Sequence, residues 1–163
     1  MKVAIIGANG QLGSDIFQVY TKAGHTIKAL NHNKIDITNF SKCFDVFRVI
    51  NPDLVINTAA MHNLEKCEEN PEQSFLVNGI GVRNLALLCR DLCIPLVHFS
   101  TDYIFDGQKQ SPYTEDDVAL PLNVYGNTKL SGEIFIRAIL DSFFIVRVSG
   151  LYGHHLCRAK GGK

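Results

Sequence analysis

Near-continuous runs of apolar residues recur along the chain and predict buried β-strands. Five runs have strand length, and segments of mixed polarity separate them. Runs of this kind, without strict alternation of apolar and polar positions, are typical of parallel strands whose two faces are both covered. The predicted strands are Val3–Ile6, Thr26–Leu30, Leu54–Asn57, Leu96–Ser100 and Phe143–Val148.

Amphipathic segments between these runs predict helices at about Gln11–Ala23, Pro71–Leu92 and Asn123–Leu140. A further helix is expected to end at about Ile50, with Asp36-Ile37-Thr38 as its N-terminal cap. Strands that alternate with helices in this way predict a parallel sheet with helices on both faces. Because crossovers are right-handed, the expected fold is of the α/β class, a Rossmann-like doubly wound parallel sheet.

The composition excludes several kinds of partner. The 163 residues carry a formal net charge of +0 and contain no long run of Lys and Arg, which argues against binding to nucleic acid. No apolar run approaches the roughly 20 residues that cross a bilayer, so no membrane association is expected. Met1 and Lys2 lead directly into a strand and a glycine loop, so no signal peptide is expected.

The cysteines indicate a cellular compartment rather than a metal site. There are five of them, an odd number without a recognisable pairing pattern, which favours a reducing cytoplasm. The cluster His154-His155-Leu156-Cys157 has no spacing that is typical of zinc sites, so no bound metal is expected.

A glycine-rich loop, Gly7-Ala8-Asn9-Gly10-Gln11-Leu12-Gly13, follows the first predicted strand and opens the first helix. Gly7 permits a tight turn, Gly10 lets the backbone approach a pyrophosphate, and Gly13 allows close packing of the helix on the strand. Unpaired N–H groups at the helix N-terminus favour anionic phosphates. In this position the loop predicts binding of a dinucleotide, and the alternative is a tight structural turn.

The end of the second strand indicates which dinucleotide. A carboxylate there would bind the adenosine ribose hydroxyls and favour NAD. This chain has Asn31-His32-Asn33-Lys34 instead, so no carboxylate repels a 2′-phosphate. With His32 and Lys34 nearby as well, we expect NADPH, with Asn31 and His32 among the cofactor-binding residues and with Asp36 and Ile37 in contact with the adenine. NADH stays an alternative, because no arginine is present in this segment to bind the phosphate.

Tyr125 and Lys129 stand four positions apart in a predicted helix, so their side chains share one face. A lysine ammonium beside a phenol favours the phenolate and is expected to lower the pKa of Tyr125. A phenol of that kind could exchange a proton with a carbonyl or alcohol near neutral pH. Such a pair occurs by chance in many helices, so taken alone it favours a solvated helix face without a catalytic role.

Six stretches together resemble the extended short-chain dehydrogenase/reductases, and within them most closely the dTDP-4-dehydrorhamnose reductases. They follow that family's order along essentially the whole chain, and the run Ser100–Gly107 is the most specific of them. The stretches are Gly7–Gly13, Asp36–Thr38, Asn57–Ala60, Ser100–Gly107, Pro121–Leu130 and Arg147–Gly153.

The resemblance implies reduction by NADPH of a dTDP-4-keto-6-deoxysugar, dTDP-4-dehydrorhamnose, to dTDP-L-rhamnose. It implies that Tyr125 donates a proton to the developing alkoxide, that Thr101 hydrogen-bonds the same oxygen, and that Lys129 binds the nicotinamide ribose. By the same resemblance, Asp102 forms a hydrogen bond with a hydroxyl of the substrate, so Thr101 and Asp102 are the expected substrate-binding residues. The implied cofactor-lining positions are Gly10, Gln11, Leu12, Asp36, Ile37, Ala60, Met61, His62 and Phe99, beside the glycines Gly7 and Gly13.

Two departures from the family pattern affect these expectations. Gly150 stands where such reductases usually have a tryptophan against the sugar, which favours a related deoxysugar nucleotide. Family members are also nearly twice as long. We therefore expect residues 1–153 to form an NADP(H)-binding domain with the catalytic Thr, Tyr and Lys, and residues 154–163 to lead toward a missing sugar-nucleotide domain. Such a truncated chain should bind dinucleotide weakly and turn over poorly.

Other readings of the same sequence stay open. One is an NAD-dependent sugar-nucleotide epimerase or dehydratase, and another is a non-catalytic relative such as the regulatory subunit of methionine adenosyltransferase. Asn57 is either a polar cap on the third strand or a structural residue near the cofactor. The apolar fifth strand, if it lies at a sheet edge, favours a homodimer.

Overall fold

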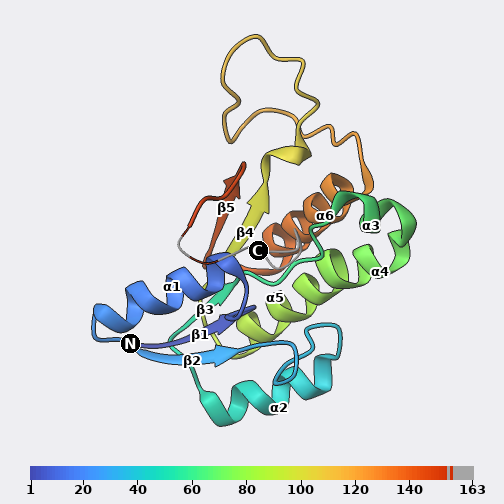
Figure 1. The fold of residues 1–163 in the computed structure, drawn as a ribbon. Helices are drawn as coiled ribbons and strands as arrows, with labels where there is room; N and C mark the ends of the chain where they lie inside the picture. The colour runs from blue at the N-terminus through green and yellow to red at the C-terminus, as the bar shows by residue number, and fades with distance from the viewer. Residues whose placement is uncertain (154, 156–163) are drawn as a thin grey trace.

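The computed structural model describes residues 1–153 and residue 155. Within them, five parallel strands form one sheet in the order β2-β1-β3-β4-β5 (Figure 1). This architecture confirms the predicted parallel sheet, and each strand lies within one residue of its expected bounds. The strands are β1 (Lys2–Ile6), β2 (Thr26–Leu30), β3 (Leu54–Asn57), β4 (Leu96–Thr101) and β5 (Phe143–Val148).

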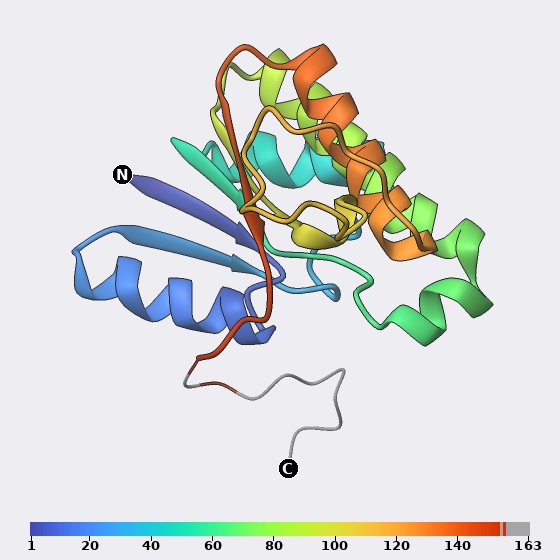
Figure 2. The ribbon, with the colours of Figure 1, turned by 90° about the horizontal axis from the view of Figure 1, so that it is seen from above.

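Helices cover both faces of the sheet, which confirms the doubly wound arrangement. Helix α1 (Gln11–Lys22) lies on one face, whereas α2 (Phe40–Ile50), α5 (Gly81–Asp91) and α6 (Val124–Ile139) lie on the other (Figure 2). Side chains that alternate along the strands fill two separate cores. Val3 and Ile5 of β1 pack toward α1, and Ala4 and Ile6 of the same strand belong to the larger core on the opposite face.

The N-terminus of α2 differs from the expectation. Asn39 caps this helix, because its side-chain oxygen accepts a hydrogen bond from the Lys42 N–H at 3.1 Å. Asp36 was expected to belong to the cap, but its carboxylate accepts hydrogen bonds from the backbone N–H and the hydroxyl of Thr38 instead. The carboxylate closes a local turn before the helix, a role that suits Asp as well as capping does.

The predicted helix Pro71–Leu92 consists of three consecutive parts. Helix α4 (Pro71–Phe75) continues through a π-helical turn, η1 (Leu76–Ile80), into α5. A short helix before it, α3 (Leu64–Glu69), was not predicted. The residue that marks the start of this helix in the sequence is its N-cap, Asn63, whose side chain accepts a hydrogen bond from the Lys66 N–H at 2.9 Å.

Strand β5 lies at one edge of the sheet, as predicted. Its side chains alternate, so that Phe143 and Ile145 pack on the core while Phe144 is 66% exposed. The expected homodimer stays a prediction. In the part of the chain that the structure describes, none of the helices combines the length and the apolar character needed to cross a membrane.

Candidate functional site

The predicted site residues converge on one edge of the molecule because all five strands are parallel. Parallel strands bring their carboxyl ends to the same edge of a sheet, and ligands of open α/β folds bind there. The glycine loop follows β1, and the segment from Asn31 follows β2. The loop with Ala60 and Met61 follows β3, and Thr101 ends β4.

The glycine loop makes a tight turn into α1. Gly7 adopts a left-handed backbone conformation with φ of 77°, and its N–H donates to the Leu30 carbonyl of β2 at 2.8 Å. Gly10 occupies the N-cap position of α1, and within the described residues no side chain caps the helix there. The first N–H groups of this twelve-residue helix lie at the same edge as the strand ends.

Replacement by alanine should have different effects at the different glycines of this loop. A Cβ at Gly13 would overlap the Gly7 carbonyl and lie 2.8 Å from the Ala8 Cα, whereas one at Gly10 would meet only the Gly7 oxygen at 3.3 Å. We expect Gly13→Ala to lower the free energy of unfolding by about 1–3 kcal/mol, because backbone must move. Gly10→Ala should leave the stability within about 0.5 kcal/mol, measured by denaturant unfolding. Equal losses for the two variants would contradict this prediction.

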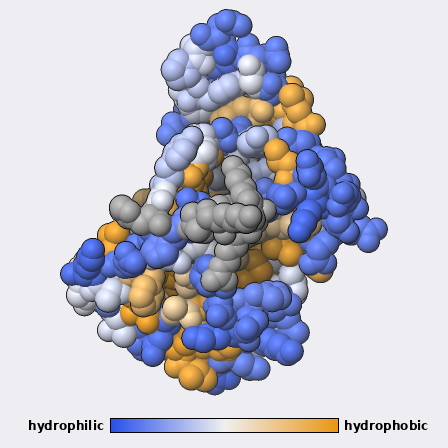
Figure 3. Space-filling view, viewed as in Figure 1, coloured by the Kyte–Doolittle hydropathy of each residue, from blue (hydrophilic) through white to orange (hydrophobic). Residues whose placement is uncertain are grey.

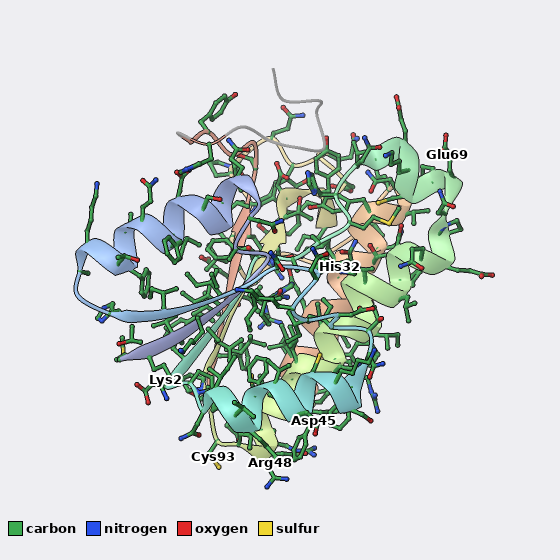
Figure 4. The ribbon with its side chains drawn as sticks, turned by 60° about the horizontal axis from the view of Figure 1, so that its bottom comes forward. Lys2, His32, Asp45, Arg48, Glu69 and Cys93 are labelled. Carbon is green, nitrogen blue, oxygen red and sulfur yellow. The ribbon has the colours of Figure 1, made fainter. Side chains whose placement is uncertain are left out.

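The segment after β2 contains an unpaired buried acceptor. Asn31 Oδ1 is buried and has no hydrogen-bond partner within the described residues. His32 is exposed beyond the end of β2 (Figure 4), and the Lys34 ammonium donates to the Ala29 carbonyl at 3.2 Å. The hydroxyl and N–H of Thr38 hold the pKa of Asp36 below its ordinary value, so this carboxylate stays ionised.

Two asparagines that the sequence did not identify hold the neighbouring loops. Asn78, in the π-helical turn, accepts from the Met61 N–H at 2.9 Å and donates to the Met61 carbonyl at 2.8 Å. The same side-chain amide donates to the Thr128 hydroxyl at 3.0 Å, which links this loop to α6. Asn84 of α5 donates to the Ile37 carbonyl at 3.0 Å. Helical segments on one face of the sheet therefore hold two predicted cofactor segments in place. Asn78 holds the loop that contains Met61, and Asn84 holds the segment that contains Ile37.

Thr101, Asp102 and Tyr125 lie together at the end of β4. The Thr101 hydroxyl donates to the Asp102 carboxylate at 3.2 Å and accepts from the Tyr103 N–H at 3.2 Å. Burial raises the pKa of Tyr125, and a hydrogen bond with Thr101 acts in the opposite direction. The Tyr103 ring meets the Tyr125 ring edge-on at 5.8 Å. The expected lowering of the Tyr125 pKa is therefore wrong, because desolvation outweighs the other contributions.

Lys129 shares the buried face of α6 but does not direct its charge at the phenol. Its Nζ donates to the Phe99 carbonyl at 2.7 Å and lies 3.2 Å from His98 Nε2. The side chain is almost completely buried, which lowers its pKa to about 8. The solvated helix face that the spacing alone allowed is wrong for this lysine. His98 was missed, although a histidine inside the apolar run Leu96–Ser100 is an unusual choice for a buried strand.

A long loop between β4 and α6 stands over this edge of the sheet (Figure 1). Arg147 holds its base: the guanidinium pairs with Glu133 at 2.7 Å, lies over the Phe105 ring at 5.3 Å and donates to the Glu115 carbonyl at 3.3 Å. The tip of the loop is hydrophilic, with apolar surface beneath it (Figure 3).

A cleft of about 270 Å³ lies beneath this loop, lined by Asp102, Tyr103, Phe105, Asp106, Gly107, Leu122 and Asn123. A larger hollow, of about 570 Å³, surrounds Asn70 and Pro71 between α3 and α4 and includes none of the predicted site residues. We place the candidate site at the smaller cleft, since it adjoins Thr101 and Tyr125.

The described residues hold no group of three or more His, Cys, Asp or Glu side chains that could bind a metal ion. Among them, Cys43, Cys67 and Cys89 are buried free thiols and Cys93 is an exposed one. The cluster at residues 154–157, which was considered as a metal site, lies outside the described residues except for His155. The same is true of the expected tail, residues 154–163.

The sheet, the glycine loop and the Thr/Tyr/Lys set define a Rossmann-fold protein of the extended short-chain dehydrogenase/reductase type. Residues 1–159 match the family described as the RmlD substrate binding domain, and the chain belongs to this family. The expected resemblance to dTDP-4-dehydrorhamnose reductases is confirmed. The enzyme of this name from Mycolicibacterium smegmatis is 38% identical over 154 residues, which cover 93% of this chain and 46% of that protein.

Solved structures show the same likeness. A dTDP-4-dehydrorhamnose reductase from Clostridium acetobutylicum superposes with a TM-score of 0.93 at 38% identity, over 99% of this chain and 57% of that one. The enzyme of this name from Bacillus anthracis, solved in complex with NADP, has a TM-score of 0.91 at 35% identity, over 94% and 55%. The chain therefore spans about half the length of the relatives it matches.

Proposed function

We propose that this chain provides the cofactor-binding and proton-donating half of an NADPH-dependent reductase that acts on a dTDP-4-keto-6-deoxysugar. The observation that carries the proposal is the set of Thr101, Tyr125 and Lys129 near the carboxyl end of β4, at the same edge of the sheet as the N-terminus of α1. The names of the relatives support the substrate class and the reaction. The proposed domain comprises residues 1–153.

The residues present fit a dinucleotide. Gly7 and Gly13 let the loop pack tightly, since a Cβ at Gly7 would lie 2.8 Å from the Ala59 nitrogen and one at Gly13 would overlap the Gly7 carbonyl, and Gly10 places no side chain over the N-terminus of α1. Within the described residues Asn31 Oδ1 has no hydrogen-bond partner, so it can accept a further donor. When bound, NADPH supplies the hydride for the ketone. We assign its binding to the predicted set Gly7, Gly10, Gln11, Leu12, Gly13, Asn31, His32, Asp36, Ile37, Ala60, Met61, His62, Phe99, Tyr125 and Lys129.

In this proposal Tyr125 donates its proton to the alkoxide oxygen, and Thr101 hydrogen-bonds the same oxygen. A raised pKa keeps Tyr125 in the protonated, donating form throughout the neutral range. Asp102, which lines the cleft beside Thr101, would accept a hydrogen bond from a sugar hydroxyl. Gly150 provides no ring to pack against a sugar, and a Cβ there would make only ordinary contact with the Tyr152 ring at 3.8 Å, which is compatible with a deoxysugar other than the rhamnose precursor.

The cofactor preference can be tested by titrating the protein with NADPH and with NADH and following the nicotinamide fluorescence. We expect tighter binding of NADPH, because no carboxylate follows β2 within the segment of Asn31 and His32. The matched variant is Asn31→Asp, which keeps the shape of the side chain and replaces its amide by a charged carboxylate. It should weaken NADPH binding about tenfold, or about 1.4 kcal/mol, and change NADH binding little. A clear preference of the unmodified chain for NADH would contradict the proposal.

A further inference from the structure

A chain of hydrogen bonds connects β3, β4 and α6 beneath the proposed nicotinamide site. The Ala59 N–H donates to Asn57 Oδ1 at 3.1 Å, and Asn57 Nδ2 lies 3.1 Å from His98 Nδ1. On the other side of the ring, His98 Nε2 lies 3.2 Å from Lys129 Nζ, which donates to the Phe99 carbonyl at 2.7 Å. Asn57, His98 and Lys129 are all at most 2% exposed. Water therefore cannot replace a partner that is lost.

The hydrogen-bond donors in this network determine the protonation state and the tautomer of the His98 imidazole. A backbone N–H can only donate, so the atom of Asn57 that faces Ala59 must be its oxygen. The amide nitrogen of Asn57 then faces His98 Nδ1, and because this NH₂ group only donates, Nδ1 must accept. His98 is consequently the neutral tautomer with its proton on Nε2. Burial first and the neighbouring Lys129 second lower the pKa of His98 well below its ordinary value, in agreement with a neutral ring.

This tautomer meets Lys129 with an N–H group. A lysine ammonium also has only donors, so the two groups would oppose each other across 3.2 Å. A neutral amine has a lone pair and can accept from Nε2–H while it still donates to the Phe99 carbonyl. The hydrogen-bond chain thus fits the amine form of Lys129 better than the ammonium form.

The surroundings of Lys129 contain influences that lower its pKa and influences that raise it. Burial lowers its pKa to about 8, while Glu133 on the same helix raises it. Glu133 is itself paired with Arg147 of β5 at 2.7 Å, and Tyr125 lies one turn before Lys129 on α6. His98 of β4 is the neighbour whose hydrogen-bonding state selects between the two forms of the lysine.

We propose that His98, oriented by Asn57, is a positioning residue that stabilises the neutral amine form of Lys129. The proposal rests on the proposed function only in that Lys129 belongs to its catalytic set. The lone pair of the amine accepts the His98 N–H while the amine donates to the Phe99 carbonyl, so the network stabilises this form of the lysine.

Two NMR measurements on the folded chain test the hydrogen-bond chain without requiring turnover. Long-range proton–nitrogen correlations of His98 should show an unprotonated Nδ1 and a protonated Nε2. The Lys129 Cε shift, followed against pH, should titrate with a midpoint near 8. In His98→Gln the amide oxygen can accept from the ammonium, so this midpoint should rise by about one pH unit, a tenfold gain in proton affinity.

The matched control is Ser100→Ala, which removes a buried hydroxyl from the same strand and the same face as His98; this hydroxyl has no hydrogen-bond partner within residues 1–153 and 155. It should leave the Lys129 midpoint unchanged. A proton on Nδ1 of His98 in the unmodified chain would overturn the proposal, as would an unchanged or lower midpoint in a folded His98→Gln variant. If that variant does not fold, the tautomer of the unmodified chain decides. A missing reductase activity with the expected tautomer and midpoint would count against the proposed function alone.

Discussion

Replacement of Tyr125 by Phe should reduce the conversion of a dTDP-4-keto-6-deoxysugar by about 10²- to 10⁴-fold, the usual contribution of a general acid. Burial raises the pKa of the Tyr125 phenol and keeps it protonated at neutral pH, so Phe at this position removes the proposed proton donor. Product should be quantified by mass spectrometry under excess NADPH, which records slow turnover as well.

The matched control for Tyr125→Phe is Tyr103→Phe. Tyr103 packs edge-on against Tyr125 at 5.8 Å and loses the same hydroxyl, but its side chain is 43% exposed. Because Tyr103 itself lines the cleft, we expect Tyr103→Phe to lose some activity, but at least about tenfold less than Tyr125→Phe, with NADPH binding of both variants measured alongside. The assignment of Tyr125 fails if Tyr125→Phe retains a third or more of the rate, or if the two variants lose activity equally.

Replacement of Arg147 by Met should lower the free energy of unfolding by about 3 kcal/mol. Arg147 pairs with Glu133 through two nitrogens, at 2.7 Å and 3.1 Å, and Glu133 is only 1% exposed. The variant leaves this carboxylate buried without its main partner, which costs more than the pair itself contributes. It also removes the contact with the Phe105 ring and the hydrogen bond to the Glu115 carbonyl, so the loop above the cleft should loosen.

Arg137→Met is the matched control, because Arg137 approaches the same carboxylate from the solvent side. Its guanidinium lies 3.7 Å from Glu133 and is 51% exposed, so this ion pair is worth at most about 0.5 kcal/mol. Denaturant unfolding should therefore separate the two variants by more than about 2 kcal/mol. Hydrogen exchange of residues 105–120 should increase in Arg147→Met only. Similar losses of stability in both variants would show that Arg147 is not the partner that compensates the buried charge.

The strand and helix pattern was accessible from the sequence because it depends on local periodicity. The apolar runs, Gly24 after α1 and Asn123 before α6 are signals contained in a few neighbouring residues. Where two neighbouring residues could each cap a helix, the sequence did not show which of them marks its start. Asp36 and Asn39 are both good caps, and the helix begins after Asn39 because Asp36 closes a turn with Thr38.

The sequence by itself determined a parallel α/β sheet, a glycine loop at the first helix and the residues Thr101, Tyr125 and Lys129 at one edge. Their ionisation and partners were decided by tertiary structure alone. Lys129 meets His98 across 31 positions of sequence, and Asn78 meets Thr128 across 50. A pKa depends on burial and on such distant partners, so the spacing of Tyr125 and Lys129 predicted a lowered tyrosine pKa where packing produces a raised one.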